Sequence, residues 1–142
     1  MYGAGLKKQL LWDLCSRLST GSTPLTLGGT GEELRDWTDV RDVVRALAAL
    51  GDEPLSGVSV FNVGTGNATP VREVAPLLAK HWARSVHSVP LSFSGQSRKG
   101  DPFSLVAEPS GLSGLGFKWH VELEQGLAEY VNWFRSQVEG QS

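Results

Sequence analysis

Helical and strand periodicities alternate along this chain, and the alternation limits its fold more than any other feature. Leucines recur every four residues from Leu6 to Leu18, as on the apolar face of an amphipathic helix. The short run Leu25-Thr26-Leu27 follows and ends in the glycine-rich turn 28–31. This pattern predicts a strand that leads into a tight turn.

The rest of the chain repeats this alternation. The expected helices cover 40–50, 70–82 and 123–138, with a weak one over 109–115, and the expected strands cover 58–63, 86–89 and 103–107. Thr38-Asp39 supply acceptors at the start of the second helix, Gly51 ends it, and Thr69 caps the third. Residues 32–35 and 92–100 are polar and predict loops. Alternating helices and strands define an α/β fold.

Composition favours one folded domain over 1–142 and excludes several functions. Apolar residues make up 40% of the 142, and the formal net charge is −2, so no overall field attracts nucleic acid or an anionic membrane. No apolar run reaches the about 20 residues that span a bilayer. Cys15 is the single cysteine, and Met1 to Gly5 lacks the features of a secretory signal, which predicts a cytoplasmic protein.

Three segments and the amino-terminal residues carry a family resemblance. They are Gly29 to Ala46 with its core Arg35-Asp36-Trp37; Phe61 to Gly66 with the helix that follows; Arg98 to Pro102 with Leu115 to Phe117 and the last helix; and Tyr2-Gly3-Ala4-Gly5. Read in order, they resemble the carboxy-terminal, substrate-binding half of the NAD-dependent epimerase/dehydratase family of the extended short-chain dehydrogenases. These proteins act on nucleotide sugars.

The resemblance implies a partial fold, namely the substrate-binding lobe without the amino-terminal Rossmann domain. It also implies contacts with a nucleotide-diphosphate sugar: Arg35 and Arg98 with the diphosphate, Asp101 with the ribose, the backbone of Thr26 and Leu27 with the base, and Tyr2 near the junction with the sugar. Arginine suits a diphosphate because its planar guanidinium donates two parallel hydrogen bonds and stays charged.

Two motifs of that family are absent from these 142 residues. There is no Gly-x-x-Gly-x-x-Gly turn, which receives the cofactor pyrophosphate. There is no Tyr-x-x-x-Lys pair either, because Tyr2 and Tyr130 are followed four residues later by Leu6 and Phe134. The family uses NAD or NADP, but we expect no catalytic or cofactor-binding residue in this chain. Alone, it is expected to be catalytically incomplete.

Simpler roles compete with the proposed contacts. Arg35 could be a surface arginine paired with Asp36 or Asp39, Arg98 could belong to a solvated basic loop, and Asp101 could cap a local turn. The histidines His81, His87 and His120 lie too far apart in sequence for a metal-ligand motif, so no metal site is expected.

Three functions remain open at the level of sequence. The leading one is a nucleotide-sugar-binding lobe. The second is a subunit that completes an NAD(P)-dependent epimerase or dehydratase with a separate cofactor-domain chain, and the third is a self-associating remnant that binds no ligand. Because the strand expected at 58–63 would belong to the sheet of the absent domain, it would expose an edge, so we also predict a homo-oligomer, such as a dimer that completes one sheet.

Overall fold

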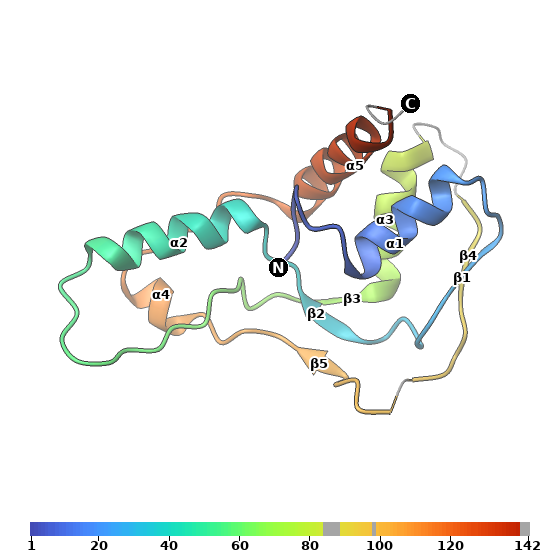
Figure 1. Ribbon diagram of the computed structural model, residues 1–142. Coiled ribbons are helices and arrows are strands. Elements are labelled where there is room, and N and C mark those ends of the chain that lie inside the picture. Colours follow the sequence, from blue (N-terminus) through green and yellow to red (C-terminus); the bar gives the residue numbers. More distant parts are fainter. Residues whose placement is uncertain (84–88, 98, 140–142) are drawn as a thin grey trace.

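The computed structural model describes residues 1–83, 89–97 and 99–139. Its core lies where three helices pack together: α1 (Gln9–Ser19), α3 (Val71–Ala83) and α5 (Leu123–Glu139) (Figure 1). The side chains of this core come from all three helices, from the first strand and from the amino terminus. They include Tyr2, Leu14, Cys15, Leu25, Leu78, Leu127, Tyr130 and Phe134.

Two small sheets flank this core. In one, β1 (Leu25–Leu27) pairs in parallel with β4 (Leu91–Phe93). In the other, β2 (Leu34–Asp36) lies between β3 (Ala68–Pro70), which is antiparallel to it, and β5 (Ser104–Leu105), which is parallel. The helices α2 (Val40–Asp52) and α4 (Ser110–Gly114) extend away from the core on the far side of β2 (Figure 1).

The mixed α/β class and the helices predicted from periodicity are confirmed. In α3, whose apolar residues recur at helical spacing, Val74, Ala75 and Leu78 are fully buried. Asp39 caps α2 as predicted, because its carboxylate accepts a hydrogen bond from the amide of Arg41. The helix continues one residue past Gly51. On α5, Val138, the last residue of the predicted range, is 43% exposed.

Two predicted loops were wrong in part, since each overlaps a strand at one end. Residues 32–35 run into β2, and residues 92–100 begin within β4. Both strands are three residues long and carry polar side chains, so their local sequence does not distinguish them from loops. They are strands because neighbouring segments pair with them.

The strand predicted for residues 58–63 was also wrong. Its composition suits a strand, but the structure contains no strand there, because no other described segment pairs with it. The strand predicted for 103–107 is limited to β5. The one predicted for 86–89 falls mostly on residues 84–88, which lie outside the described part of the chain.

The first backbone amides of α3 are hydrogen-bonded differently from the prediction. Thr69 belongs to β3 rather than capping the helix. The first two helical amides, of Val71 and Arg72, donate instead to the carbonyls of Glu33 and Gly31. The loop between β1 and β2 therefore holds the amino terminus of α3 in place.

Candidate functional site

Two parallel strand pairs and the loops that connect them build the candidate site. The chain passes from β1 to β2 through residues 28–33, and from β4 to β5 through residues 94–103. Since β1 pairs with β4 and β2 pairs with β5, the two loops run side by side. They contact each other where Gly29 forms a bridge with Gln96 and the amide of Gly95 donates to the carbonyl of Gly29 at 3.0 Å.

Arg35 lies on the central strand of the second sheet. One guanidinium nitrogen, Nη1, donates to the carbonyl of Leu34 at 2.8 Å and to that of Phe103 at 3.3 Å. The side chain is 22% exposed. These two bonds hold the guanidinium beside the second connecting loop and leave part of it accessible.

Asp101 lies beside Arg35, at the end of that loop. Its Oδ1 is 3.7 Å from Nη2 of Arg35, and its side chain is 53% exposed. The pair is at the long end of ion-pair distances and in contact with water, so it is a weak interaction that a phosphate can replace. The structure thus brings together two of the three charged residues expected at the site. Arg98 lies outside the described residues, so the convergence of two guanidinium groups stays a prediction.

Thr26 and Leu27 lie on β1, at the other end of the connecting loops. Leu27 is buried, whereas Thr26 points outward, and its hydroxyl lies 3.0 Å from that of Ser92 on β4. The carbonyl of Thr26 accepts a hydrogen bond from Arg17 at 3.0 Å. This strand therefore presents a hydroxyl pair to solvent, while the Thr26 carbonyl is already occupied.

Tyr2 lies in the core rather than on an open surface. It is 2% exposed, and its hydroxyl has no hydrogen-bond partner among the described residues. Its backbone amide donates to the carbonyl of Thr38, and its carbonyl accepts from the amide of Val40. Burial, together with the nearby carboxylate of Asp39, raises the pKa of its phenol. Tyr2 reaches the site only through the backbone that follows β2.

Asp36 lies beside the site, and the sequence had indicated only that it could pair with Arg35. Its carboxylate accepts hydrogen bonds from the amides of Thr65, Gly66 and Ala107 and from the hydroxyl of Thr38. Burial alone would raise its pKa, but these donors lower the pKa below its usual value. Asp36 fixes the end of β2 against the 64–66 turn, so it is a structural anchor and Arg35 is not its partner.

A second carboxylate, that of Glu33, shapes the loop between β1 and β2. It accepts hydrogen bonds from the amides of Thr30 and Gly31, both at 2.8 Å, and these bonds, led by that of Thr30, lower its pKa. Gly31 has φ of 84°, and a side chain there would contact the ring of Phe93. Only glycine fits this turn, which explains the glycine-rich motif seen in the sequence.

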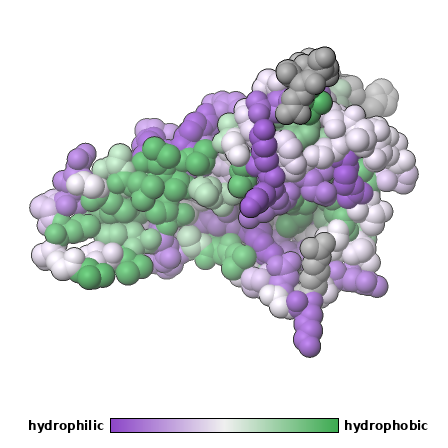
Figure 2. All heavy atoms as spheres, viewed as in Figure 1, coloured by the Kyte–Doolittle hydropathy of each residue, from purple (hydrophilic) through white to green (hydrophobic). Residues whose placement is uncertain are grey.

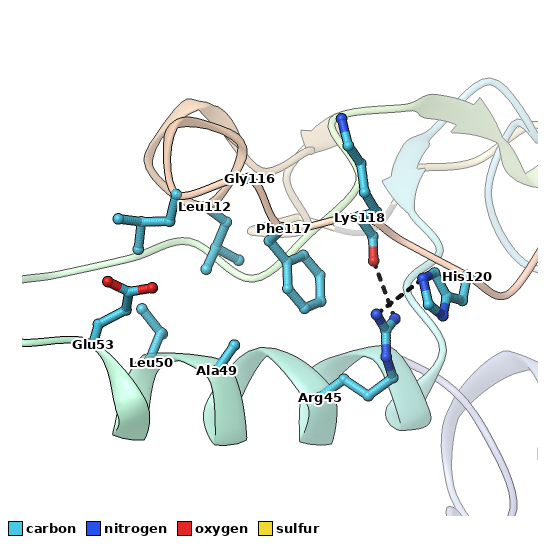
Figure 3. Close-up of a pocket in the computed structure, with 10 residues that line it drawn as sticks. Arg45, Ala49, Leu50, Glu53, Leu112, Gly116, Phe117, Lys118 and His120 are labelled. Carbon is cyan, nitrogen blue, oxygen red and sulfur yellow. Dashed lines mark hydrogen bonds between the residues drawn. The ribbon is translucent and has the colours of Figure 1, made fainter.

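One cavity, about 310 Å³, lies between α2 and residues 112–120 (Figure 3). Its floor is apolar, and Arg45 lies at one end. The guanidinium of Arg45 is already engaged by Asp42 at 2.6 Å, the carbonyl of Lys118 at 3.1 Å and the ring of His120 at 3.1 Å. None of the predicted site residues lines this cavity, so we interpret Arg45 as structural.

The second cavity, about 180 Å³, is lined by two tryptophans, Trp37 and Trp119, and by polar side chains of the 65–69 segment. The indole nitrogens of both tryptophans are enclosed and have no hydrogen-bond partner among the described residues. Because those nitrogens are not exposed to the cavity, they cannot donate to a molecule within it. Within the described ranges, no cluster of three histidine, cysteine or acidic side chains could hold a metal ion.

The fold of this chain is similar to part of the fold of nucleotide-sugar epimerases. The chain superposes on MoeE5 in complex with UDP-glucuronic acid and NAD, with 33% identity and a TM-score of 0.76 over 96% of this chain and 44% of that one. It superposes on the UDP-glucose 4-epimerase of Thermotoga maritima, solved with UDP-glucose, with 28% identity and a TM-score of 0.79 over 96% and 44%. The dTDP-L-rhamnose 4-epimerase of Burkholderia thailandensis is 30% identical over 89% of this chain and 34% of its own length.

Residues 1–64 match the sequence model of the NAD-dependent epimerase/dehydratase family. The chain spans about a third of the curated Burkholderia relative and less than half of the two solved chains. In the part of the chain that the structure describes, no helix has the length and apolar character needed to cross a membrane.

Proposed function

We propose that this chain forms the substrate-binding lobe of a nucleotide-sugar epimerase or dehydratase, and that it binds the diphosphate of a nucleotide sugar through Arg35. The observation that supports this is the position of Arg35: two backbone carbonyls hold its guanidinium at the loop that carries Asp101. Two similar solved proteins contain UDP-sugars.

Each predicted residue has a part in this proposal. Arg35 and Arg98 pair with the diphosphate, Asp101 accepts from the ribose hydroxyls, and the strand of Thr26 and Leu27 lines the base pocket. Because β1 and β2 are joined by the short loop 28–33, these contacts follow the order in which base, ribose and diphosphate are linked. Tyr2 contributes by supporting the backbone after β2.

Isothermal titration calorimetry with UDP-, GDP- and dTDP-sugars tests this function. We expect binding with at least one of them, and a loss of about 10- to 100-fold in affinity for Arg35→Ala, since hydrogen bonds to charged groups contribute about 1.5–3 kcal/mol. Arg35→Lys should recover only part, because lysine lacks the planar pair of donors. Arg72→Ala is the control. It removes the same charge from an arginine that pairs with Glu32, so an equal loss would indicate general electrostatics and contradict a specific role for Arg35.

Asp101 offers a separate test of the ribose contact. If Asp101 accepts hydrogen bonds from the ribose, Asp101→Asn weakens binding. If Asp101 only competes with the phosphate for Arg35, the same change tightens binding. Tighter binding would remove Asp101 from the site while leaving the role of Arg35 intact.

The second candidate function is that of a subunit that acts with a separate cofactor-domain chain. It is favoured by the length of the match, since the chain covers only 44% of two solved proteins, one of which contains NAD as well as a UDP-sugar. We expect the chain alone to show no change in nicotinamide absorbance when mixed with NAD and a UDP-sugar. Turnover by the chain alone would contradict catalytic incompleteness, and an absence of heat with every nucleotide sugar would favour the non-binding, self-associating remnant.

A further inference from the structure

Strand β1 has one paired edge and one edge without a strand partner. Within the described ranges it pairs with β4 and with no other strand. The amide of Leu25 donates to a carbonyl that precedes β4, and the carbonyl of Leu27 accepts from an amide that follows β4. Consecutive residues of a strand direct their backbone groups to opposite edges. The amide and the carbonyl of Thr26 therefore point away from β4.

Arg17 of helix α1 lies at this second edge. Its Nη1 donates to the carbonyl of Thr26 at 3.0 Å and is 3.8 Å from the carboxylate of Asp13, one helical turn earlier. The side chain of Arg17 is 34% exposed. Among the described residues, no hydrogen bond from the amide of Thr26 is found, and the hydroxyl of Thr26 is paired with that of Ser92. A molecule at this edge therefore meets the backbone of Thr26 and the guanidinium of Arg17.

The order of these groups defines a hydrogen-bonding pattern. Along the edge, the amide of Thr26 is a donor, the carbonyl of Thr26 is an acceptor and the guanidinium of Arg17 is a donor. The carbonyl can still accept a second hydrogen bond, because its oxygen has two lone pairs. The guanidinium has five N–H donors and no acceptor. The edge therefore matches a partner that presents an acceptor, a donor and an acceptor in that order.

Uracil and thymine present this pattern. Two keto oxygens flank one ring N–H in each base, so the pattern is the same from either end. Cytosine has an amino group in place of one keto oxygen, and its ring nitrogen carries a lone pair instead of a proton. At this edge, cytosine would set a donor against Arg17 and an acceptor against the carbonyl of Thr26. Polar groups that lose their partners in this way weaken binding strongly.

We propose that Arg17 selects the base of the nucleotide sugar, and that the base is uracil or thymine. This role rests on the proposed function, in which β1 lines the base pocket, and adds a residue and a class of base to it. In Figure 2 the apolar surface gathers over α2, at the end of the molecule away from β1. The edge of β1 thus distinguishes bases by hydrogen bonds rather than by apolar burial.

A purely structural role is the alternative for Arg17. The guanidinium would then only attach the end of α1 to β1 and leave the choice of base to the backbone. In that case, replacing Arg17 would change the affinities for all nucleotide sugars by the same factor. The ratio of the affinities for two bases therefore distinguishes the two roles.

Isothermal titration calorimetry of the 142-residue chain with UDP-glucose and CDP-glucose tests the role of Arg17, because the two ligands differ only in the pyrimidine. We expect UDP-glucose and dTDP-glucose each to bind at least about tenfold more tightly than CDP-glucose. Arg17→Met keeps the length of the side chain but removes its donors, and should reduce this ratio by about threefold or more. Arg17→Gln offers an acceptor to the amino group of cytosine and should reduce the ratio as well.

Two further variants separate the base contact from the rest of the site. Arg72→Met is the matched control, since Arg72 pairs with Glu32, and it should leave the ratio unchanged. Arg35→Ala should lower the affinities for UDP-glucose and CDP-glucose alike, because both carry the same diphosphate. Circular dichroism should show that these variants and the two Arg17 variants remain folded.

The possible failures are distinguishable. Equal affinities for UDP-glucose and CDP-glucose, or binding of GDP-glucose alone, would overturn the choice of base and leave the contact of Arg35 with the diphosphate intact. A ratio that stays the same in a folded Arg17→Met or Arg17→Gln protein would overturn the role of Arg17. An absence of heat with all four nucleotide sugars would overturn the proposed function and the role of Arg17 together.

Discussion

Gly126→Ala tests how closely α5 approaches the amino terminus of the chain. Gly126 lies in the first turn of α5, directly against the ring of Tyr2. A Cβ atom at this position would overlap the hydroxyl oxygen and lie 2.8 Å from Cζ and 3.0 Å from Cε2. Tyr2 cannot move away easily, because its backbone is hydrogen-bonded to that of Thr38 and Val40 and the residue is 2% exposed.

The expected magnitude is the difference between two opposing effects. Alanine stabilises a helix by about 1 kcal/mol relative to glycine. Overpacking a rigid core costs about 1–3 kcal/mol, and the contacts here involve a buried ring rather than a flexible side chain. The cost should therefore lie in the upper part of that range, at about 2–3 kcal/mol, and we expect Gly126→Ala to lower the free energy of unfolding by about 1–2 kcal/mol after the helix gain is subtracted.

Urea denaturation followed by tryptophan fluorescence measures this change. Gly51→Ala in α2 is the control, because a Cβ there would meet no atom within 4 Å, and it should be neutral or stabilising. Tyr2→Phe removes the overlapping oxygen, so Gly126→Ala should cost less in that background. A stable Gly126→Ala protein, or an unchanged cost in the Tyr2→Phe background, would refute the proposed overlap.

Three further outcomes follow from buried groups. Asp42→Ala leaves the amides of His120 and Val121 without acceptors and should lower the free energy of unfolding by about 2–4 kcal/mol in urea denaturation. Burial would raise the pKa of Asp36, but its hydrogen bonds lower that pKa. The folded state therefore loses stability as the pH falls below about 4, which is the pKa of the carboxyl in the unfolded chain. Asp36→Asn should reduce this pH dependence in denaturation curves recorded at acidic pH. Burial raises the pKa of Cys15 to about 12, so a thiol reagent near neutral pH should react only after unfolding.

The elements that sequence predicted well are those whose own residues bury a continuous stripe. In α3, the spacing of Val74, Ala75 and Leu78 is enough to define both the helix and its inward face. The strands β2 and β4 could not be found this way, although β1 was. β2 is a strand because β3 and β5 pair with it, and the segment 58–63 lacks such a partner despite its composition. Pairing is a property of the tertiary structure, which a local pattern does not contain.

In the candidate site, too, the local sequence does not contain the contacts that the tertiary structure makes. The proximity of Arg35 and Asp101 follows from the pairing of β2 with β5, and family resemblance was the only sequence signal that connected them. The anchoring role of Asp36 depends on amides up to 71 residues away, so nothing near it in sequence revealed the role. The burial of Tyr2 likewise depends on a glycine of the last helix.

Hydrogen bonds, rather than burial of apolar side chains, set the orientation of α2. Leaving Val44 and Leu47 in water forgoes about 1.5–3 kcal/mol for each side chain, so an isolated helix with this sequence would turn them inward. If the helix turned, Asp42 would lose the two amide donors of His120 and Val121, and the segment before α5 would lose its anchor. The hydrogen bonds of one carboxylate thus keep Val44 and Leu47 outside. Removing Asp42 should therefore lower the free energy of unfolding, whereas Leu47→Glu should leave it nearly unchanged.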